Sequence, residues 1–188
     1  MKESLRNVLA RYEPQMVIED GLRDASVLVL LYEREGEPHV VFQKRTDTVE
    51  DHKGQISLPG GGADPTDTGP EHTALRETHE EIGVAPEHID LLGRIDDVRT
   101  ISRYRMQTFV GWWDKPYPFE YSRHEVAYLI ETPLAHLRAP ETLIEDRRHV
   151  NGRDVVMASY QYGDELIWGA TAMVVRNFLD ICNLTDSE

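Results

Sequence analysis

The sequence has little of three things, and each scarcity narrows the class of protein. Its one cysteine, Cys182, rules out a framework of internal disulfides and fits a reducing compartment. No apolar run is long enough to span a bilayer, and residues 1–20 lack the basic, apolar, small-residue order of a secretion signal. Basic residues are outnumbered, 20 against 34 acidic ones, which leaves a formal net charge of −14. We therefore expect a cytoplasmic protein that binds neither membranes nor nucleic acid.

The length and composition of the chain suffice for one domain with a substantial core. The 188 residues are 40% hydrophobic and 29% charged, as is usual for a globular protein. Apolar runs and turn residues predict strands at 26–32, 39–43, 89–96, 106–113, 142–144, 154–160 and 165–168. Helices are predicted at 3–12, 70–82, 133–137 and 170–182. Because strands outnumber helices, we expect the α/β class, with a mixed sheet between helices and one domain over 1–188.

The most informative segment, 76–84, places three glutamates at the end of the predicted helix 70–82. Glu77 lies three residues before Glu80 and four before Glu81, so at about 100° per residue the carboxylates share a sector of roughly 100°. Like charges at this spacing cost about 0.2–0.5 kcal/mol per pair, and the helix dipole disfavours anions in its last turn. A bound cation would offset both penalties. Clustered carboxylate oxygens suit Mg²⁺ or Mn²⁺ rather than Zn²⁺.

A solvated acidic helix face is the alternative to a metal site. The glycines around the helix favour the metal site, because Pro59-Gly60-Gly61-Gly62 comes just before it and Gly83 ends it. A glycine-rich run beside a charged helix face lets the backbone approach a bound ion or ligand closely.

Residues 61–84 resemble the Nudix box, in which a glycine and a carboxylate precede the pattern Arg-Glu-apolar-x-Glu-Glu-x-Gly-apolar. The second half matches from Arg76 to Val84, with Thr78 in the apolar position. In the first half the carboxylate position falls on Asp67 when counted from Gly61, and the spacer to Arg76 is one residue longer than usual. The resemblance implies a Nudix-like α/β/α sandwich and metal-dependent hydrolysis of a diphosphate.

Within that family the sequence is similar to the coenzyme A pyrophosphatase branch. That branch carries an arginine and a Gly-Gln step before Phe-Pro-Gly-Gly, and then two aspartates before Ala-Leu-Arg-Glu. The matching positions here are Arg45, His52, Gly54, Gln55, Leu58, Pro59, Gly60, Gly61, Asp64, Asp67, Ala74, Leu75, Arg76 and Glu77. Leu58 replaces the phenylalanine, and Glu50 reverses the charge of the arginine that the branch usually has. The similarity covers about residues 25–182.

The resemblance also implies roles for the residues of the box. Glu77 and Glu81 are expected to bind Mg²⁺ or Mn²⁺, followed by Glu80, with a backbone carbonyl near Gly61 as a further ligand. Arg76 is expected to orient the carboxylate of Glu77 without contacting substrate.

The general base is left open between a box glutamate such as Glu80 and a residue of a later loop. The resemblance places Glu125 in that loop, opposite the helix, and His124 beside it is a weaker candidate. The residues expected to hold the phosphates of the substrate are Lys44, Arg45, Gly60 and Gly61.

Two further expectations concern the rest of a coenzyme A substrate. Trp112 and Trp113 point to opposite faces of a predicted strand, so one is expected in the core and the other is a candidate for stacking on adenine. The candidates for contact with the 3′-phosphate are Lys53, Arg99, Arg103 and Arg105.

The implied reaction is hydrolysis of coenzyme A or its thioesters to 3′,5′-ADP and a 4′-phosphopantetheine product, by a monomer or homodimer with a small-molecule diphosphate as its partner. The same chemistry on ADP-ribose, NADH or a nucleoside triphosphate is the first alternative, and Glu50 keeps it open. A non-catalytic nucleotide sensor of the same fold is a second, although all three glutamates are present. An isoprenoid diphosphate isomerase is a third, and it would want a cysteine near the site, whereas Cys182 lies in a predicted core helix.

Overall fold

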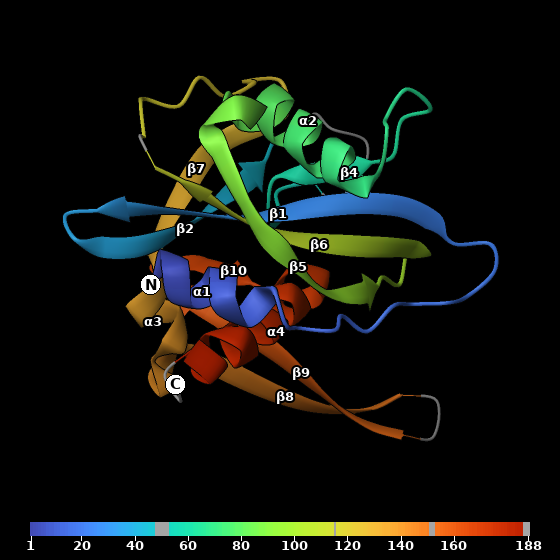
Figure 1. Ribbon diagram of the computed structural model, residues 1–188. Coiled ribbons are helices and arrows are strands. Elements are labelled where there is room, and N and C mark those ends of the chain that lie inside the picture. Colours follow the sequence, from blue (N-terminus) through green and yellow to red (C-terminus); the bar gives the residue numbers. More distant parts are fainter. Residues whose placement is uncertain (48–52, 115, 151–152, 186–188) are drawn as a thin grey trace.

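The computed structural model describes residues 1–47, 53–114, 116–150 and 153–185. Glu50 and His52, two positions of the coenzyme A signature, lie outside the described residues. Within these ranges, helices lie on both sides of a large mixed sheet, and a smaller sheet packs on one of those sides (Figure 1).

Over the described ranges, the large sheet has seven strands. They are β1 (Arg23–Arg34), β2 (Glu37–Arg45), β3 (Ile56–Ser57), β4 (Gly60–Gly62), β5 (Ile89–Arg99), β6 (Tyr104–Trp113) and β7 (Val126–Pro133). β1 pairs in parallel with β6, whereas its pairings with β2 and β4 and the β5–β6 pairing are antiparallel. β2 also pairs with β3 and β7, both antiparallel. The expected mixed sheet is therefore confirmed.

Helix α2 (Pro70–Ile82) covers one face of this sheet, while α1 (Lys2–Leu9) and α4 (Gly169–Thr185) cover the other (Figure 1). The smaller antiparallel sheet lies on the side of α4 and consists of β8 (Leu143–Val150), β9 (Arg153–Tyr162) and β10 (Glu165–Ile167). The short helix α3 (Leu134–Arg138) follows β7, and single 3₁₀ turns occupy Pro86–His88 and Pro140–Thr142. The α/β/α arrangement expected from the family resemblance is thus observed.

β1 is buried on both faces, as its continuous apolar run predicts. Val27 and Val29 pack into the core on the side of α4, and Leu28 and Leu30 pack into a second core beneath α2. Cys182 is completely buried in the first of these cores, which agrees with a packing role.

The two adjacent tryptophans of β6 also lie in different cores. Trp112 packs on the α4 side of the sheet and Trp113 on the α2 side. Both are buried, with exposed fractions of 5% and 0%. The expected core tryptophan is confirmed, and neither ring is exposed as the candidate for stacking on adenine, because both are packed on the two faces of β6.

Helix α2 begins and ends where its flanking residues predict. Gly69 is the N-cap, Pro70 the first helical residue, and Gly83 ends the helix in the left-handed region at φ 76°. A Cβ on Gly83 would also lie 2.6 Å from the carbonyl oxygen of Glu120. Glycine is therefore required twice, once for the backbone turn and once for the close approach of the segment that leads to β7.

The strands β3, β4 and β7 were not expected. β4 could not be predicted from the sequence, because three consecutive glycines have no alternation of apolar and polar side chains. The strand forms because the backbone packs closely against β1: at Gly60, with φ 147°, an added Cβ would lie 2.6 Å from Cα of Val27.

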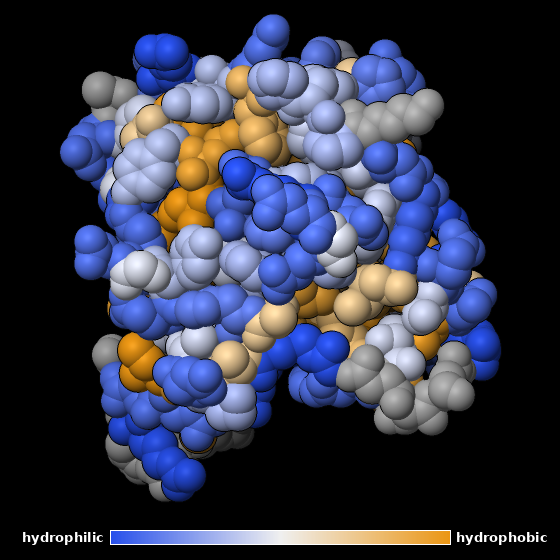
Figure 2. All heavy atoms as spheres, turned by 90° about the vertical axis from the view of Figure 1, so that its left-hand side faces the viewer, coloured by the Kyte–Doolittle hydropathy of each residue, from blue (hydrophilic) through white to orange (hydrophobic). Residues whose placement is uncertain are grey.

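Hydrophilic side chains cover most of the side of the molecule in Figure 2, and apolar side chains gather there in separate patches. Among the described helices, none combines the length and apolar character needed to cross a bilayer.

Candidate active site

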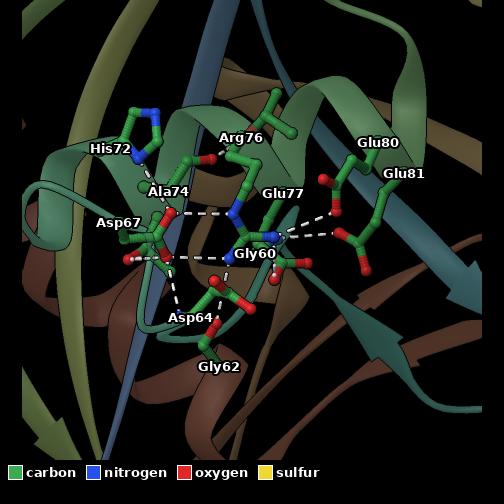
Figure 3. A network of polar contacts seen from close by, with 12 residues as sticks. Gly60, Gly62, Asp64, Asp67, His72, Ala74, Arg76, Glu77, Glu80 and Glu81 are labelled. Carbon is green, nitrogen blue, oxygen red and sulfur yellow. Dashed lines mark hydrogen bonds and ion pairs between the residues drawn. The ribbon is translucent and has the colours of Figure 1, made fainter.

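Three segments meet at the last two turns of α2. They are the glycine strand β4, the C-terminal end of β2, and the residues just before β7. Figure 3 shows the glutamates of α2 and the residues of the glycine loop around the guanidinium of Arg76.

Glu81 points into the protein. Its side chain is only 5% exposed, its Oε2 accepts a hydrogen bond from the Gly60 backbone N–H at 2.8 Å, and its Oε1 lies 3.5 Å from Nη1 of Arg45. Burial raises the pKa of the Glu81 carboxyl to about 7, although the hydrogen bond from Gly60 acts in the opposite direction. A carboxylate that is buried and only partly compensated favours a cation beside it.

Glu77 lies against Gly61. A Cβ on Gly61 would be 2.5 Å from Cδ of Glu77 and 2.6 Å from its Oε2, so only glycine leaves room for this carboxylate. The side chain is 18% exposed, and burial raises its pKa against the opposing effect of Arg76. Glu77 and Glu81 therefore border adjacent residues of the same glycine strand.

Arg76 connects the glutamates to the preceding loop (Figure 3). Its Nε and Nη2 donate to the two oxygens of Asp67 at 2.9 and 3.0 Å, and its Nη1 donates to Glu77 at 2.8 Å and Glu80 at 3.0 Å. Nη2 also donates to the carbonyl of Gly62 at 3.2 Å. One guanidinium thus sets the positions of three carboxylates, those of Asp67, Glu77 and Glu80, relative to the glycine strand.

Asp67 occupies the carboxylate position of the box, and its sequence context alone does not indicate its role. Its side chain is 3% exposed, and hydrogen bonds from Arg76 hold its pKa well below the usual range. Its place in the box was the available signal, but the bond to Arg76 depends on how the loop folds back onto α2.

The three glutamates differ in exposure. The Glu80 side chain is 55% exposed, against 18% for Glu77 and 5% for Glu81. Their carboxylates do not form a ready-made cluster: within the described residues, no group of three His, Cys, Asp or Glu side chains is placed to hold a metal ion. Arg76 contacts Glu77 and Glu80, whereas Gly60 and Arg45 contact Glu81.

The donors present nevertheless fit a hard divalent cation. Glu77 and Glu81 supply carboxylate oxygens beside a strand without side chains, and the missing Cβ of Gly61 leaves the backbone open to a ligand. Mg²⁺ and Mn²⁺ prefer oxygen ligands, and Mg²⁺ needs few carboxylates because it retains water.

The segment before β7 brings Glu125 to the same place. The Thr46 backbone N–H donates to the carbonyl of Glu125 at 2.9 Å, and the Thr46 hydroxyl donates to the carbonyl of His124 at 2.8 Å. The charge of Glu125 is close enough to contribute to the raised pKa of Glu77. The structure therefore brings Glu125 together with the box glutamates.

The adjacent side chains of Lys44 and Arg45 point to opposite faces of the sheet. Arg45 faces Glu81, whereas Nζ of Lys44 forms an ion pair with Glu165 of β10 at 2.6 Å, on the other side of the sheet. Successive residues of a strand point to opposite faces, and this explains the difference. The structure thus does not bring Lys44 to the carboxylates.

Two candidates for contact with a 3′-phosphate are also engaged elsewhere. Arg99 pairs with Glu19 at 2.6 Å, and Arg105 pairs with Asp24 at 2.7 Å.

Comparison with known proteins gives a consistent result. The NUDIX domain model matches residues 22–151. The chain is 34% identical over 179 residues to a protein of Cronobacter sakazakii named uncharacterized Nudix hydrolase NudL, covering 92% of each chain. It is 35% identical over 158 residues to the protein of that name from Yersinia pestis, covering 82% of this chain and 77% of the relative.

Two solved structures share the fold. A MutT/nudix family protein from Enterococcus faecalis superimposes with a TM-score of 0.56 at 16% identity, covering 97% of this chain and 75% of that one. The Nudix hydrolase RenU from M. smegmatis gives 0.52 at 23% identity, covering 68% and 83%.

Proposed function

Because this chain belongs to the NUDIX domain family and is a hydrolase that cleaves pyrophosphate bonds, we propose that its substrate is coenzyme A or a derivative of it. The products are 3′,5′-ADP and 4′-phosphopantetheine or its acylated form. Members of the family generally use divalent metal ions, and we propose Mg²⁺ or Mn²⁺ here.

The observation that carries this proposal is the meeting of two parts of the coenzyme A signature at one carboxylate. Arg45 and Gly60 both contact Glu81, and the Arg45 backbone N–H donates to the carbonyl of Gln55 at 2.9 Å. The Gly-Gln step of the signature is therefore joined to the strand end that carries Arg45. A guanidinium at this position can bind a phosphate bidentately beside a metal-bound diphosphate.

Each residue of the site then has its own proposed role. We assign metal binding to Glu77 and Glu81, assisted by Glu80 and by the backbone carbonyl of Gly61. The metal, when bound, neutralises phosphate charge and lowers the pKa of the attacking water. Arg76 keeps the carboxylates of Glu77 and Glu80 in place.

Glu125 is the proposed general base. It lies in the segment just before β7, its charge acts on Glu77, and it would take the proton of the attacking water. Glu80 is the alternative base, since its exposed carboxylate is also at the site.

The test compares kcat/KM for coenzyme A, dephospho-coenzyme A, ADP-ribose and NADH with each metal. We expect coenzyme A to be cleaved with the highest kcat/KM. Dephospho-coenzyme A should have a kcat/KM about 10- to 100-fold lower, because it lacks the one or two charge-assisted hydrogen bonds that the 3′-phosphate makes. Product analysis should show 3′,5′-ADP. Equal turnover of all four compounds would overturn the choice of coenzyme A.

One observation favours a second candidate, the same hydrolysis of another nucleoside diphosphate derivative such as ADP-ribose. Arg99 and Arg105, two of the four candidates for contact with the 3′-phosphate, are paired with Glu19 and Asp24. Fewer cations are therefore available for a 3′-phosphate than the sequence led us to expect. A preference for ADP-ribose in the same comparison would support this candidate.

A further inference from the structure

Gln43 is a buried polar residue whose hydrogen-bonding capacity is not fully used. It lies on β2 with an exposed fraction of 0%, next to the carboxyl of Glu81, whose pKa it lowers. Yet neither Nε2 nor Oε1 of its amide makes a hydrogen bond of standard geometry within the described residues. A carboxamide can donate two hydrogen bonds and accept two, so this side chain retains unused capacity.

The strand places this amide beside the proposed metal site. Alternate residues of β2 share a face, and on this face Val41 packs into the core beneath α2 while Arg45 contacts Glu81. Gln43 lies between them, at the point where the core gives way to the carboxylates. Gly60 approaches Glu81 from β4. Two strands therefore surround one carboxylate of α2.

A neutral donor differs from Arg45 in one important respect. A guanidinium beside Glu81 competes with a divalent cation, because it neutralises the same charge. An amide N–H orients a carboxylate while leaving its charge available. An amide that uses only part of its hydrogen-bonding capacity in the core lowers stability, and methionine would fill a similar volume without that cost.

We propose that Gln43 is a positioning residue that holds the Glu81 carboxylate from the sheet side in the orientation that binds the metal. This inference rests on the proposed function, because it takes Glu81 to be a metal ligand. Gln43 itself contacts neither metal nor substrate.

The test measures Mn²⁺ binding to the full-length protein without substrate, by the electron paramagnetic resonance signal of free Mn²⁺. For Gln43→Met we expect affinity about 10-fold weaker, the usual loss when a residue behind a ligand is removed. The melting temperature of the metal-free variant should stay close to that of the wild type, because the lost contact with Glu81 is offset by no longer burying an amide with unused hydrogen-bonding groups. A purely structural role would instead lower the melting temperature and leave Mn²⁺ affinity unchanged.

Thr132→Val is the matched control. Thr132 is also fully buried with an unpartnered hydroxyl, but it lies on β7 opposite Val40. This variant should bind Mn²⁺ like the wild type. Glu81→Gln is the reference, and adding Gln43→Met to it should cause no further loss, because the two residues act through one carboxylate.

The outcomes separate the two proposals. If Glu81→Gln weakens Mn²⁺ binding and Gln43→Met does not, the role of Gln43 is wrong and the proposed function stands. If Glu81→Gln leaves Mn²⁺ binding unchanged, the metal site itself is wrong, and both proposals fail.

Discussion

Gly61 lies directly against the carboxylate of Glu77, so that a Cβ on the glycine would come within 2.5 Å of Cδ of Glu77. The neighbouring glycine, Gly60, lies against the backbone of β1 instead, since a Cβ on it would lie 2.6 Å from Cα of Val27. One glycine makes room for a functional side chain, and the other allows two strands to approach.

This difference predicts that the two alanine variants fail in different ways. Gly61→Ala displaces only the end of a flexible side chain, so we expect a stability loss of about 1 kcal/mol or less but a loss of activity of about 10-fold or more. Gly60→Ala strains two backbones and should cost about 2 kcal/mol or more. Thermal unfolding and kcat/KM of both variants check this. Similar losses of stability in the two would contradict it.

Asp67 should stabilise the fold through its buried pairing with Arg76. Replacing it with asparagine should cost about 2–4 kcal/mol, since a partly buried guanidinium loses the carboxylate that accepts two of its hydrogen bonds. Because the folded-state pKa of Asp67 is lowered, its contribution is complete above the unfolded value of about 4 and declines as pH falls below it. Urea unfolding at neutral and acid pH should show the difference between wild type and Asp67→Asn shrinking in acid. A constant difference would exclude the ion pair as its source.

Metal binding should depend on pH through Glu81. Its carboxyl has a pKa raised to about 7 in the metal-free protein, so a proton must leave before a cation binds. We expect Mn²⁺ affinity to rise up to about tenfold per pH unit below pH 7 and then to level off. Calorimetry in buffers of different ionisation enthalpy should detect the released proton. In Glu81→Gln this release should be absent.

The general base can be assigned by comparing Glu125→Gln with Glu80→Gln. Removal of the base should lower kcat about 10²- to 10⁴-fold with little change in KM, and should abolish the acidic limb of the pH–rate profile. We expect this behaviour for Glu125→Gln and a smaller effect for Glu80→Gln. The opposite ranking would move the role to Glu80.

Adjacent residues on β2 should differ sharply in their effect on catalysis. Arg45→Gln should raise KM about 10-fold or more, because a charge-assisted phosphate contact is lost. Lys44→Gln should leave kcat and KM unchanged and cost at most about 1 kcal/mol of stability, since its ion pair with Glu165 is partly exposed. An equal rise of KM in both variants would show that Lys44 reaches the substrate.

Local signals predicted much of the fold. The bounds of α2 follow from Gly69, Pro70 and Gly83, each of which acts within its own turn. The long apolar run of β1 predicts a strand buried on both faces, which the structure has. β4 could not be predicted in this way, because its glycines form a strand only when β1 lies beside them.

The sequence by itself determined the chemistry of this protein: three glutamates on one face of a helix, a glycine run before them, and an arginine to hold them. Only the tertiary structure decided which residue does what. It buries Glu81, leaves Glu80 exposed, turns Arg45 toward the site and Lys44 away from it, and closes Asp67 onto Arg76. The physical reason is that burial and pairing depend on which segments pack together, and the spacing of residues along one helix or strand does not contain that information.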